Sequence, residues 1–269
     1  MNNNMPNNPG GDKEIVDILG LWVCPLRTEE LNSKILGVIK KRERAIIPNI
    51  NVYFATLVLR QPWLRDFFNL APFNFCDGVG IILGARLLGK SIPERITYAD
   101  WMWSLAELAE TNRLRLFFLG GRPGLAALSA QNLKKIHPGL QVVGTGHGYF
   151  DKADSGADNM AVIREINQSH PHILITAFGM PLQEKWLQDN WHNLNVNIGL
   201  TGGAVFDYLS GWLRRPPLFL RRLGLEWLGR LFLEPKRLWR RYLIGIPIFL
   251  WHVLKQRLKL DGRCKPDKI

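Results

Sequence analysis

Residues 114–124 constrain the fold of this chain more than any other stretch. Leu114–Leu119 is a continuous apolar run, which is typical of a strand buried on both faces of a sheet. A glycine-rich turn, Gly120–Gly124, follows the run, and a helical pattern continues to about His137. A strand that passes through a tight turn into a helix is the repeating unit of a parallel α/β sheet.

The same alternation extends along most of the chain. Further strands are predicted at 15–23, 45–51, 140–143, 172–178 and 196–200, and helices at 98–111, 158–169 and 183–191. This spacing predicts an α/β fold with a Rossmann-like parallel sheet and helices on both faces. We expect three parts: a disordered N-terminal tail at 1–11, an α/β domain at 12–213 and a basic C-terminal appendage at 214–269.

Composition restricts the class of protein. Hydrophobic residues make up 46% and charged residues 22% of the 269 residues, which favours a globular chain. The three cysteines are far apart and show no disulfide or zinc spacing, so a reducing compartment is expected. The Asn/Pro/Gly-rich start has neither the basic nor the apolar region of a signal peptide.

Positive charge is concentrated at the C-terminal end. The net charge is +12, and the residues from Arg214 onward hold 15 Lys/Arg against 4 Asp/Glu. Such asymmetry indicates an acidic partner, which can be nucleic acid, anionic lipid or a phosphate-bearing substrate. Four of these basic residues fall near one helical face: Arg222, Arg230, Arg237 and Arg241.

The apolar part of this appendage suits a membrane surface. Pro235 is predicted to divide the appendage into two or three short helices. Leu243–Leu254 is apolar but shorter than the ~20 residues that span a bilayer. A basic amphipathic segment with aromatic side chains fits the membrane interface. The alternative is a helical cap on the core with a solvated basic face.

Asp77 is the candidate catalytic residue. It ends the apolar run within Phe73–Gly80 and is followed by Gly-Val-Gly, which lets the backbone turn closely before a helix. Ligands of open α/β sheets bind outside the carboxyl ends of the strands, where an acid can act as a base or bind a hydroxyl. The alternative is an Asp-Gly turn with a solvated side chain.

Other turns after predicted strands carry further candidates. The amides of Gly120–Gly124 can bind a diphosphate at a helix N-terminus, and His147 lies in a glycine-rich loop. Gln183, Glu184 and Asp207 lie near the starts of two later helices, where an acid is also favoured by the helix dipole alone.

The chain has no Asp-x-Asp pair, His-Glu-x-x-His, Cys-x-x-Cys or Gly-x-Ser-x-Gly, so we expect no metal and no cofactor.

Seven motifs, in order, resemble the WecG/TagA/CpsF family of bacterial glycosyltransferases, which extend lipid-linked sugars. Six of them are Cys-Asp-Gly-Val-Gly at Cys76, Pro-Glu-Arg-Ile-Thr at Pro93 with Asp100 following, Leu-Gly-Gly-Arg-Pro-Gly at Leu119, Gly-His-Gly-Tyr-Phe at Gly146, Phe-Gly-Met-Pro-Leu-Gln-Glu-Lys-Trp at Phe178 and Gly-Gly-Ala-Val-Phe-Asp at Gly202. The seventh is the tail motif, Arg-Arg-Leu-Gly-Leu-Glu-Trp with Glu-Pro-Lys-Arg-Leu-Trp-Arg-Arg-Tyr.

The resemblance implies an inverting, metal-independent hexosyltransferase whose C-terminal appendage docks on the membrane and lends arginines to the site. It implies Asp77 as catalytic base and polar roles for Asn51, Arg95, Gln183 and Asp207. Asn49 departs from the family, which often has Thr there, so donor preference can differ. The complete set of expected substrate-binding residues is Asn49, Asn51, Arg95, Thr97, Asp100, Gly120, Gly121, Gln183, Glu184, Asp207, Arg214, Arg215, Arg221 and Arg222.

The resemblance further implies a UDP-sugar donor, a polyprenyl-diphosphate-linked sugar acceptor and an anionic membrane surface as partners. We expect no nucleic acid and a peripheral position on the inner face of the cytoplasmic membrane. The sugar is left open among N-acetylmannosamine, its uronic acid and a hexose such as glucose, and a homo-oligomer is also left open.

Two other classes compete with this assignment. A nucleotide-binding dehydrogenase needs a glycine fingerprint directly after its first strand, where this chain has Val-Cys-Pro-Leu at Val23. A nucleic-acid-binding module fits the interleaved Arg and Trp of the tail, but the proline breaks and the aliphatic run at Ile244–Leu254 suit lipid better.

Overall fold

A five-stranded parallel sheet forms the centre of the larger of two compact units. The computed structural model describes residues 14–154, 156–217, 220 and 225–262. Unit 1 comprises residues up to Leu26, Asn49–Arg95 and residues from Arg215 onward, and unit 2 comprises Arg27–Pro48 and Ile96–Arg214. The division therefore places part of the N-terminal half in the same unit as the C-terminal segment.

The sheet of unit 2 confirms the predicted parallel α/β architecture. Its strand order is β3-β9-β8-β6-β7, and every pairing is parallel. The strands are β3 (Ala45–Ile47), β6 (Arg115–Gly120), β7 (Gln141–Gly146), β8 (Ile173–Ala177) and β9 (Ile198–Thr201). The continuous apolar runs of β6 and β8 are buried at almost every position, because helices cover the sheet.

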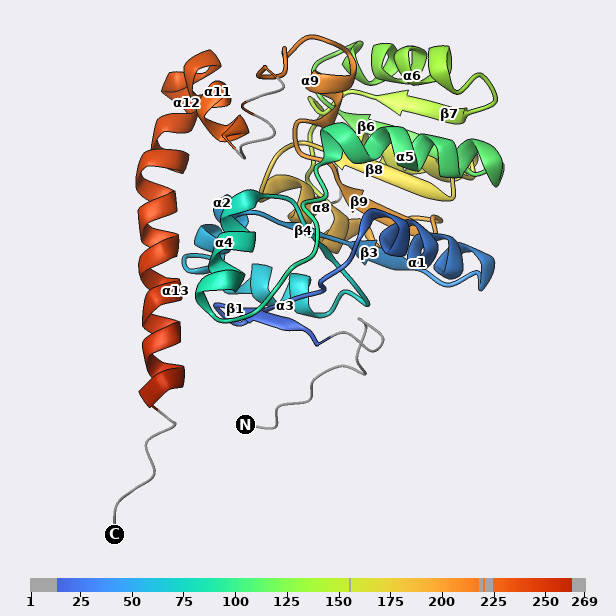
Figure 1. Cartoon of the computed structure of the whole chain (residues 1–269). Coiled ribbons are helices and arrows are strands. Elements are labelled where there is room, and N and C mark those ends of the chain that lie inside the picture. Colours follow the sequence, from blue (N-terminus) through green and yellow to red (C-terminus); the bar gives the residue numbers. More distant parts are fainter. Residues whose placement is uncertain (1–13, 155, 218–219, 221–224, 263–269) are drawn as a thin grey trace. The chain divides into compact units, whose positions relative to one another are not determined.

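Helices flank this sheet (Figure 1). They are α1 (Thr28–Lys40), α5 (Tyr98–Thr111), α6 (Leu125–Ile136), α7 (Ala157–Gln168), α8 (Leu182–Asn190) and α9 (Val205–Leu209). Each of the longer helices presents one apolar stripe; in α6 this stripe includes Leu125, Ala126, Ala130 and Leu133. The helices between 98 and 191 lie within one or two residues of their predicted bounds.

The predicted first strand at 15–23 is wrong, because the segment is a hairpin. β1 (Val16–Ile18) pairs antiparallel with β2 (Leu21–Val23) in unit 1. Leu19 and Gly20 form the turn with φ of 56° and 79°, and the N–H of Gly20 donates to Asp17 Oδ1 at 2.8 Å. Two positive φ angles are what a two-residue hairpin turn requires.

The predicted second strand at 45–51 is also divided. Pro48 separates β3 from β4 (Asn49–Ile50), and β4 pairs with β5 (Phe75–Cys76) in a two-stranded parallel sheet of unit 1. Proline lacks the N–H that a continuous ladder needs. The strand before Asp77 therefore does not belong to the five-stranded sheet, contrary to the sequence-based expectation.

The remaining helices of the N-terminal half of unit 1 are short. They are α2 (Val52–Val58), α3 (Trp63–Asn69) and α4 (Val79–Leu87). Gly80 permits close packing in this unit, since a Cβ there would lie 2.3 Å from Val52 Cγ2. The thiols of Cys24 and Cys76 are both buried in this unit, and Cys264 lies outside the described residues.

The described residues from Glu226 to Gly262 are helical and divided at Pro235 as predicted, but the second part is longer than predicted. α11 (Glu226–Leu233) ends before Pro235 as expected, but α12 (Pro235–Trp239), a π-helical turn (Arg240–Ile244) and α13 (Gly245–Gly262) follow one another directly. Pro247 comes just after the π-helical turn, where the backbone hydrogen-bond register already changes, so its missing N–H does not end the helix. In the described part of the chain, no helix is both long and apolar enough to cross a bilayer.

α13 packs on α2 and α4 through one buried face. Phe249 and Val253 are 0% exposed, and a Cβ at Gly84 would lie 2.8 Å from the Phe249 ring. The side chain of Gln256 accepts from Leu19 N at 2.9 Å and donates to Asp17 O at 3.1 Å. The C-terminal helix is therefore an integral part of unit 1.

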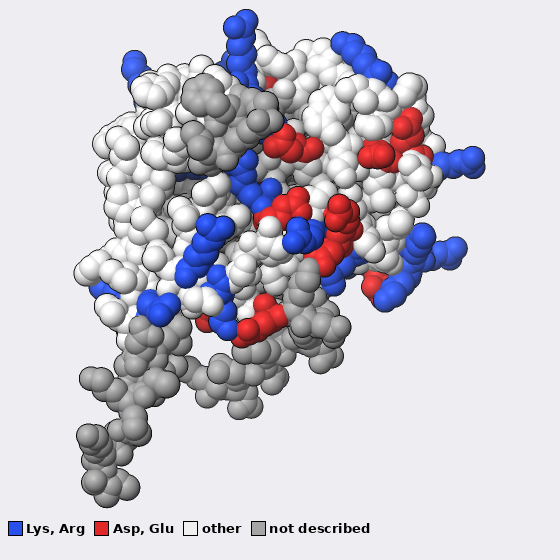
Figure 2. Space-filling model, viewed as in Figure 1, with Lys and Arg blue, Asp and Glu red and all other residues white. Residues whose placement is uncertain are grey.

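The opposite face of this segment exposes an apolar stripe. It consists of Leu243, Ile244, Trp251, Leu254 and Leu258, which are 43–61% exposed. Lys255 and Lys259 flank the stripe and are exposed as well. Figure 2 shows the surface over α13 as mostly uncharged, with scattered Lys and Arg side chains.

Replacing Phe249 with Ala tests whether α13 is structurally required. We expect Phe249→Ala to reduce the free energy of unfolding of unit 1 by about 3–5 kcal/mol, because a buried ring leaves a cavity. Urea denaturation followed by circular dichroism measures the loss. Trp251→Ala, on the exposed face of the same helix, is the control and should reduce stability by clearly less than Phe249→Ala, because Trp251 is 56% exposed and Phe249 is 0% exposed. Equal stability of both variants would contradict this packing.

Candidate active site

Asp77 lies directly after β5, in the turn that leads into α4. Its N–H donates to Ile50 O at 2.8 Å, which extends the β4–β5 pairing by one bond. Asp77 Oδ2 accepts a hydrogen bond from Asn49 Nδ2 at 3.0 Å. The residue as a whole is partly exposed, and the hydrogen bond from Asn49 holds its carboxyl group in place.

The two predicted asparagines have different local roles. Asn49 is 2% exposed and binds the carboxylate of Asp77. Asn51 is the N-cap of α2, where its Oδ1 accepts from Phe54 N at 3.0 Å. The structure therefore places one asparagine against Asp77 and uses the oxygen of the other to begin a helix.

The surroundings of Asp77 raise its pKa to about 6. Burial is the largest cause of this rise, and the negative charge of Glu226 raises the pKa further. The positive charges of Arg95, Arg241 and Arg230 lower the pKa. All of these groups belong to unit 1. A carboxyl group with this pKa is mostly ionised at neutral pH and is a stronger base than an ordinary aspartate.

Glu226, at the start of α11, joins two of the predicted arginines. Its carboxylate lies 3.6 Å from Arg95 Nη1 and 3.2 Å from Arg215 Nη2. The three side chains are only 13–21% exposed. Sequence reasoning missed Glu226; the available signal was its position as the first acid of a strongly basic segment.

Arg241 adds a further positive charge in unit 1. Its guanidinium lies 4.5 Å from the ring centroid of Tyr53, and burial lowers the pKa of Arg241. Arg214 belongs to unit 2 and is exposed. Arg221 and Arg222, which were predicted to bind substrate, lie outside the described residues, as does the side chain of Arg237.

The other predicted site residues of unit 2 lie near the carboxyl end of its sheet or at the start of α5. Thr97 Oγ1 donates to Asp100 Oδ2 at 2.8 Å in the first turn of α5. Gly120 has no room for a side chain, since a Cβ would lie 2.5 Å from Ala177 O on β8. The N–H of Gly121 donates to the same oxygen at 3.0 Å. Close strand packing therefore accounts for Gly120, and a positive φ of 68° accounts for Gly121.

Gln183 and Glu184 are both 0% exposed at the start of α8. Gln183 Oε1 accepts from Gly179 N and Gly203 N, and its Nε2 donates to Glu184 Oε1 at 2.9 Å. Burial raises the pKa of Glu184 to about 7, against the opposing effect of the Gln183 hydrogen bond. Asp207, in α9, is partly exposed.

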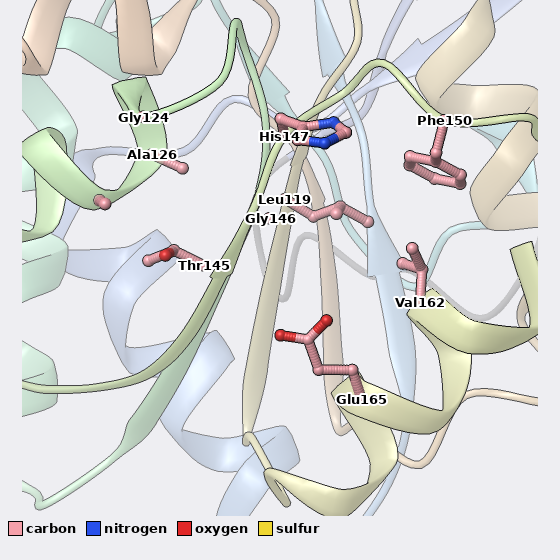
Figure 3. A pocket seen from close by; sticks show the side chains of 10 residues that line it. Leu119, Gly124, Ala126, Thr145, Gly146, His147, Phe150, Val162 and Glu165 are labelled. Atoms are coloured by element: carbon pink, nitrogen blue, oxygen red, sulfur yellow. The ribbon is translucent and has the colours of Figure 1, made fainter. Parts of the chain in front are cut away.

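A pocket of about 290 Å³ lies near the ends of β6 and β7 in unit 2. Its walls are Leu119, Gly124, Ala126, Ala127, Thr145, Gly146, His147, Phe150, Val162 and Glu165. Figure 3 shows Glu165 projecting from α7 into the pocket, with His147 and Phe150 on the other side of Leu119. His147 Nδ1 accepts from Tyr149 N at 3.2 Å. The pocket thus combines apolar walls with one carboxylate.

The fold is a parallel α/β fold, and unit 1 holds a cluster of acids and arginines that acts on Asp77. Residues 16–263 match the glycosyl transferase WecG/TagA/CpsF family. The chain belongs to this family and is a hexosyltransferase. This membership removes the dehydrogenase alternative.

Three relatives share one name, N-acetylglucosaminyldiphosphoundecaprenol N-acetyl-beta-D-mannosaminyltransferase. The protein of Bacillus spizizenii W23 is 30% identical over 211 residues, which cover 78% of this chain and 79% of the relative. That of Bacillus subtilis 168 is 29% identical over 228 residues, covering 83% and 85%. That of Staphylococcus aureus NCTC 8325 is 25% identical over 195 residues, covering 72% and 74%.

Glu226→Gln tests the charge balance around Asp77. Removing the negative charge of Glu226 lowers the pKa of Asp77, so we expect the acid limb of the kcat/KM profile to move to lower pH by roughly one unit. Wild-type kcat/KM should rise through about pH 6 as Asp77 loses its proton and level off above. Initial rates between pH 4.5 and 8.5 measure this.

Asp66→Asn is the matched control, because Asp66 is an exposed acid of unit 1 that does not act on Asp77. Its profile should coincide with that of the wild type. An acid limb that stays in place in Glu226→Gln, or moves to higher pH, would contradict the role given to Glu226.

Proposed function

We propose that this chain transfers a sugar from a UDP-sugar to a hydroxyl of a polyprenyl-diphosphate-linked sugar, with inversion of the anomeric carbon and without a metal ion. N-acetylmannosamine is the sugar that we favour, because the relatives are named for its transfer. The uronic acid of N-acetylmannosamine and glucose are the other donors to compare. The product would be a lipid-linked precursor for a cell-surface polymer.

Asp77 is the proposed base, and the observation that supports it is a carboxylate of raised pKa that Asn49 holds in place. The acceptor oxygen forms a bond to the anomeric carbon while the bond to the donor phosphate breaks. The hydroxyl proton passes to the Asp77 carboxylate, and UDP leaves with the bonding electrons. General-base assistance of this kind typically contributes ~10²–10⁴ in rate.

The arginines of unit 1 are proposed to balance the negative charge of the phosphates. Arg95 and Arg215 meet at one carboxylate, and Arg230 and Arg241 act electrostatically on Asp77. Fixed guanidinium groups in a partly buried region stabilise phosphate charge without reorganisation. This arrangement supports a transfer that uses no metal ion.

Unit 2 is proposed to bind the nucleotide of the donor. Parallel α/β sheets bind ligands outside the carboxyl ends of their strands, and the pocket at β6 and β7 lies there. Apolar walls such as Leu119 and Phe150 suit a flat base, and the Glu165 carboxylate can accept from a ring N–H. Asp207 remains a candidate for a ribose hydroxyl.

The exposed stripe of α13 is proposed to lie on the inner face of the membrane, where the acceptor is anchored. An interfacial helix needs an apolar face with Trp and Leu, flanked by Lys or Arg. The stripe from Leu243 to Leu258, with Lys255 and Lys259 beside it, has this composition. The buried side of α13 would keep unit 1 attached to this surface.

Asp77→Asn should retain donor binding and lose about 10²–10⁴ of kcat, because an amide cannot take the proton. The assay supplies a synthetic lipid diphosphate sugar with a panel of UDP-sugars and detects the product by mass spectrometry. Donor affinity is measured by calorimetry. Asp66→Asn should behave like the wild type. Turnover of Asp77→Asn near the wild-type rate would exclude Asp77 as base.

Trp251→Ser combined with Leu258→Ser should release the protein from anionic vesicles. Each large apolar side chain contributes roughly 1.5–3 kcal/mol when buried, so each loss should weaken binding by about tenfold or more. Flotation with phosphatidylglycerol vesicles measures this, with Leu70→Ser as control, since Leu70 is 83% exposed at the end of α3. Equal flotation of the double variant and the control would contradict this membrane surface.

A further inference from the structure

Gln183 ties together two turns at the carboxyl end of the sheet in unit 2. Its Oε1 accepts from Gly179 N at 3.2 Å, in the turn after β8, and from Gly203 N at 3.0 Å, in the turn after β9. Both glycines have positive φ, of 85° and 62°. One buried amide oxygen thus fixes the backbone of two neighbouring turns.

The Gln183 Nε2 group is buried together with this oxygen, so it needs a hydrogen-bond acceptor. At the start of a helix the nearby backbone presents unpaired N–H groups, whereas its carbonyls point away along the axis. The backbone around Gln183 therefore offers donors where an acceptor is needed. A side-chain oxygen can meet this need.

Glu184 supplies that oxygen. Its Oε1 accepts from Gln183 Nε2 at 2.9 Å, and the residue is 0% exposed. Its Oε2 accepts no hydrogen bond from any side chain or backbone group that the structure describes. A buried carboxyl with one unmatched oxygen costs free energy, so an apolar residue would be favoured here if the bond to Gln183 had no purpose.

We propose that Glu184 is a positioning residue, which holds the Gln183 amide so that it joins the turns after β8 and β9. Glu184 would then act without touching the substrate, unlike the binding role that the sequence suggested. The kinetic consequence rests on the proposed glycosyl transfer, because Asp207 follows the second of these turns. The structural consequence does not depend on any activity.

The experiment compares Glu184→Ala with Glu184→Gln in the full chain. Hydrogen exchange of the amides of Gly179 and Gly203, resolved by NMR, reports directly on the bonds to Gln183 Oε1. We expect both amides to exchange roughly tenfold faster in Glu184→Ala. Gln183 Nε2 then loses its acceptor, so the Gln183 side chain is no longer held where its Oε1 accepts from the two glycines. Glu184→Gln keeps an acceptor oxygen and should stay within about threefold of the wild type.

Two further variants keep the test decisive. Lys185→Gln removes an exposed ion pair with Asp189 on the same helix and should leave both amides unchanged. Gln183→Leu should reproduce the fast exchange of Glu184→Ala, and the double variant should add nothing, since both residues act through one bond. If Glu184→Ala does not fold, Gln183→Leu and Glu184→Gln still give opposite expected results.

Enzyme kinetics then connects this positioning to the reaction. We expect Glu184→Ala to raise the donor KM, with rescue by Glu184→Gln. Slow exchange in Glu184→Ala, equal to that of Lys185→Gln, would overturn the proposal, as would equally fast exchange in Glu184→Gln. A wild-type protein without turnover on any UDP-sugar would refute the proposed function alone, because the exchange rates decide the positioning separately.

Discussion

The charge balance around one carboxyl group is the interaction on which the proposed chemistry depends. Asp77 is withdrawn from water far enough to raise its pKa, while a second acid and three arginines act on it with opposite signs. Burial without nearby cations would leave the Asp77 carboxyl protonated at neutral pH. Cations without burial would lower its pKa and make the carboxylate a weak base. The structure combines both effects in one unit of the fold.

This balance explains why the C-terminal segment is more than a basic appendage. Residues from Arg215 onward belong to the same compact unit as Asp77, and Glu226, Arg230 and Arg241 all come from that segment. The buried face of α13 attaches the segment to α2 and α4. The C-terminal segment thus carries Glu226, Arg230 and Arg241, which act on Asp77 together with Arg95, and also the exposed stripe that we propose to contact lipid.

Local patterns were sufficient to predict the parallel sheet and most helices of unit 2, because continuous apolar runs and glycine turns act over a few residues. The hairpin at Leu19 was missed because its turn needs a positive φ at a leucine, which sequence patterns disfavour. Pro48 is a local signal for dividing the predicted strand, but the separate partners of its two halves and the role of Glu226 depend on residues far along the chain. The complete burial of Glu184 was missed for the same reason, since polar residues at a helix start are usually solvated.

Direct titration of Asp77 tests the central claim most simply. The protein is labelled with ¹³C at the aspartate carboxyl carbons, and the Asp77 signal is assigned as the one absent from Asp77→Asn. The account predicts a titration midpoint of about 6. A midpoint near the ordinary aspartate value of about 3.9 would contradict it, because the groups around Asp77 would then have no net effect on the carboxyl.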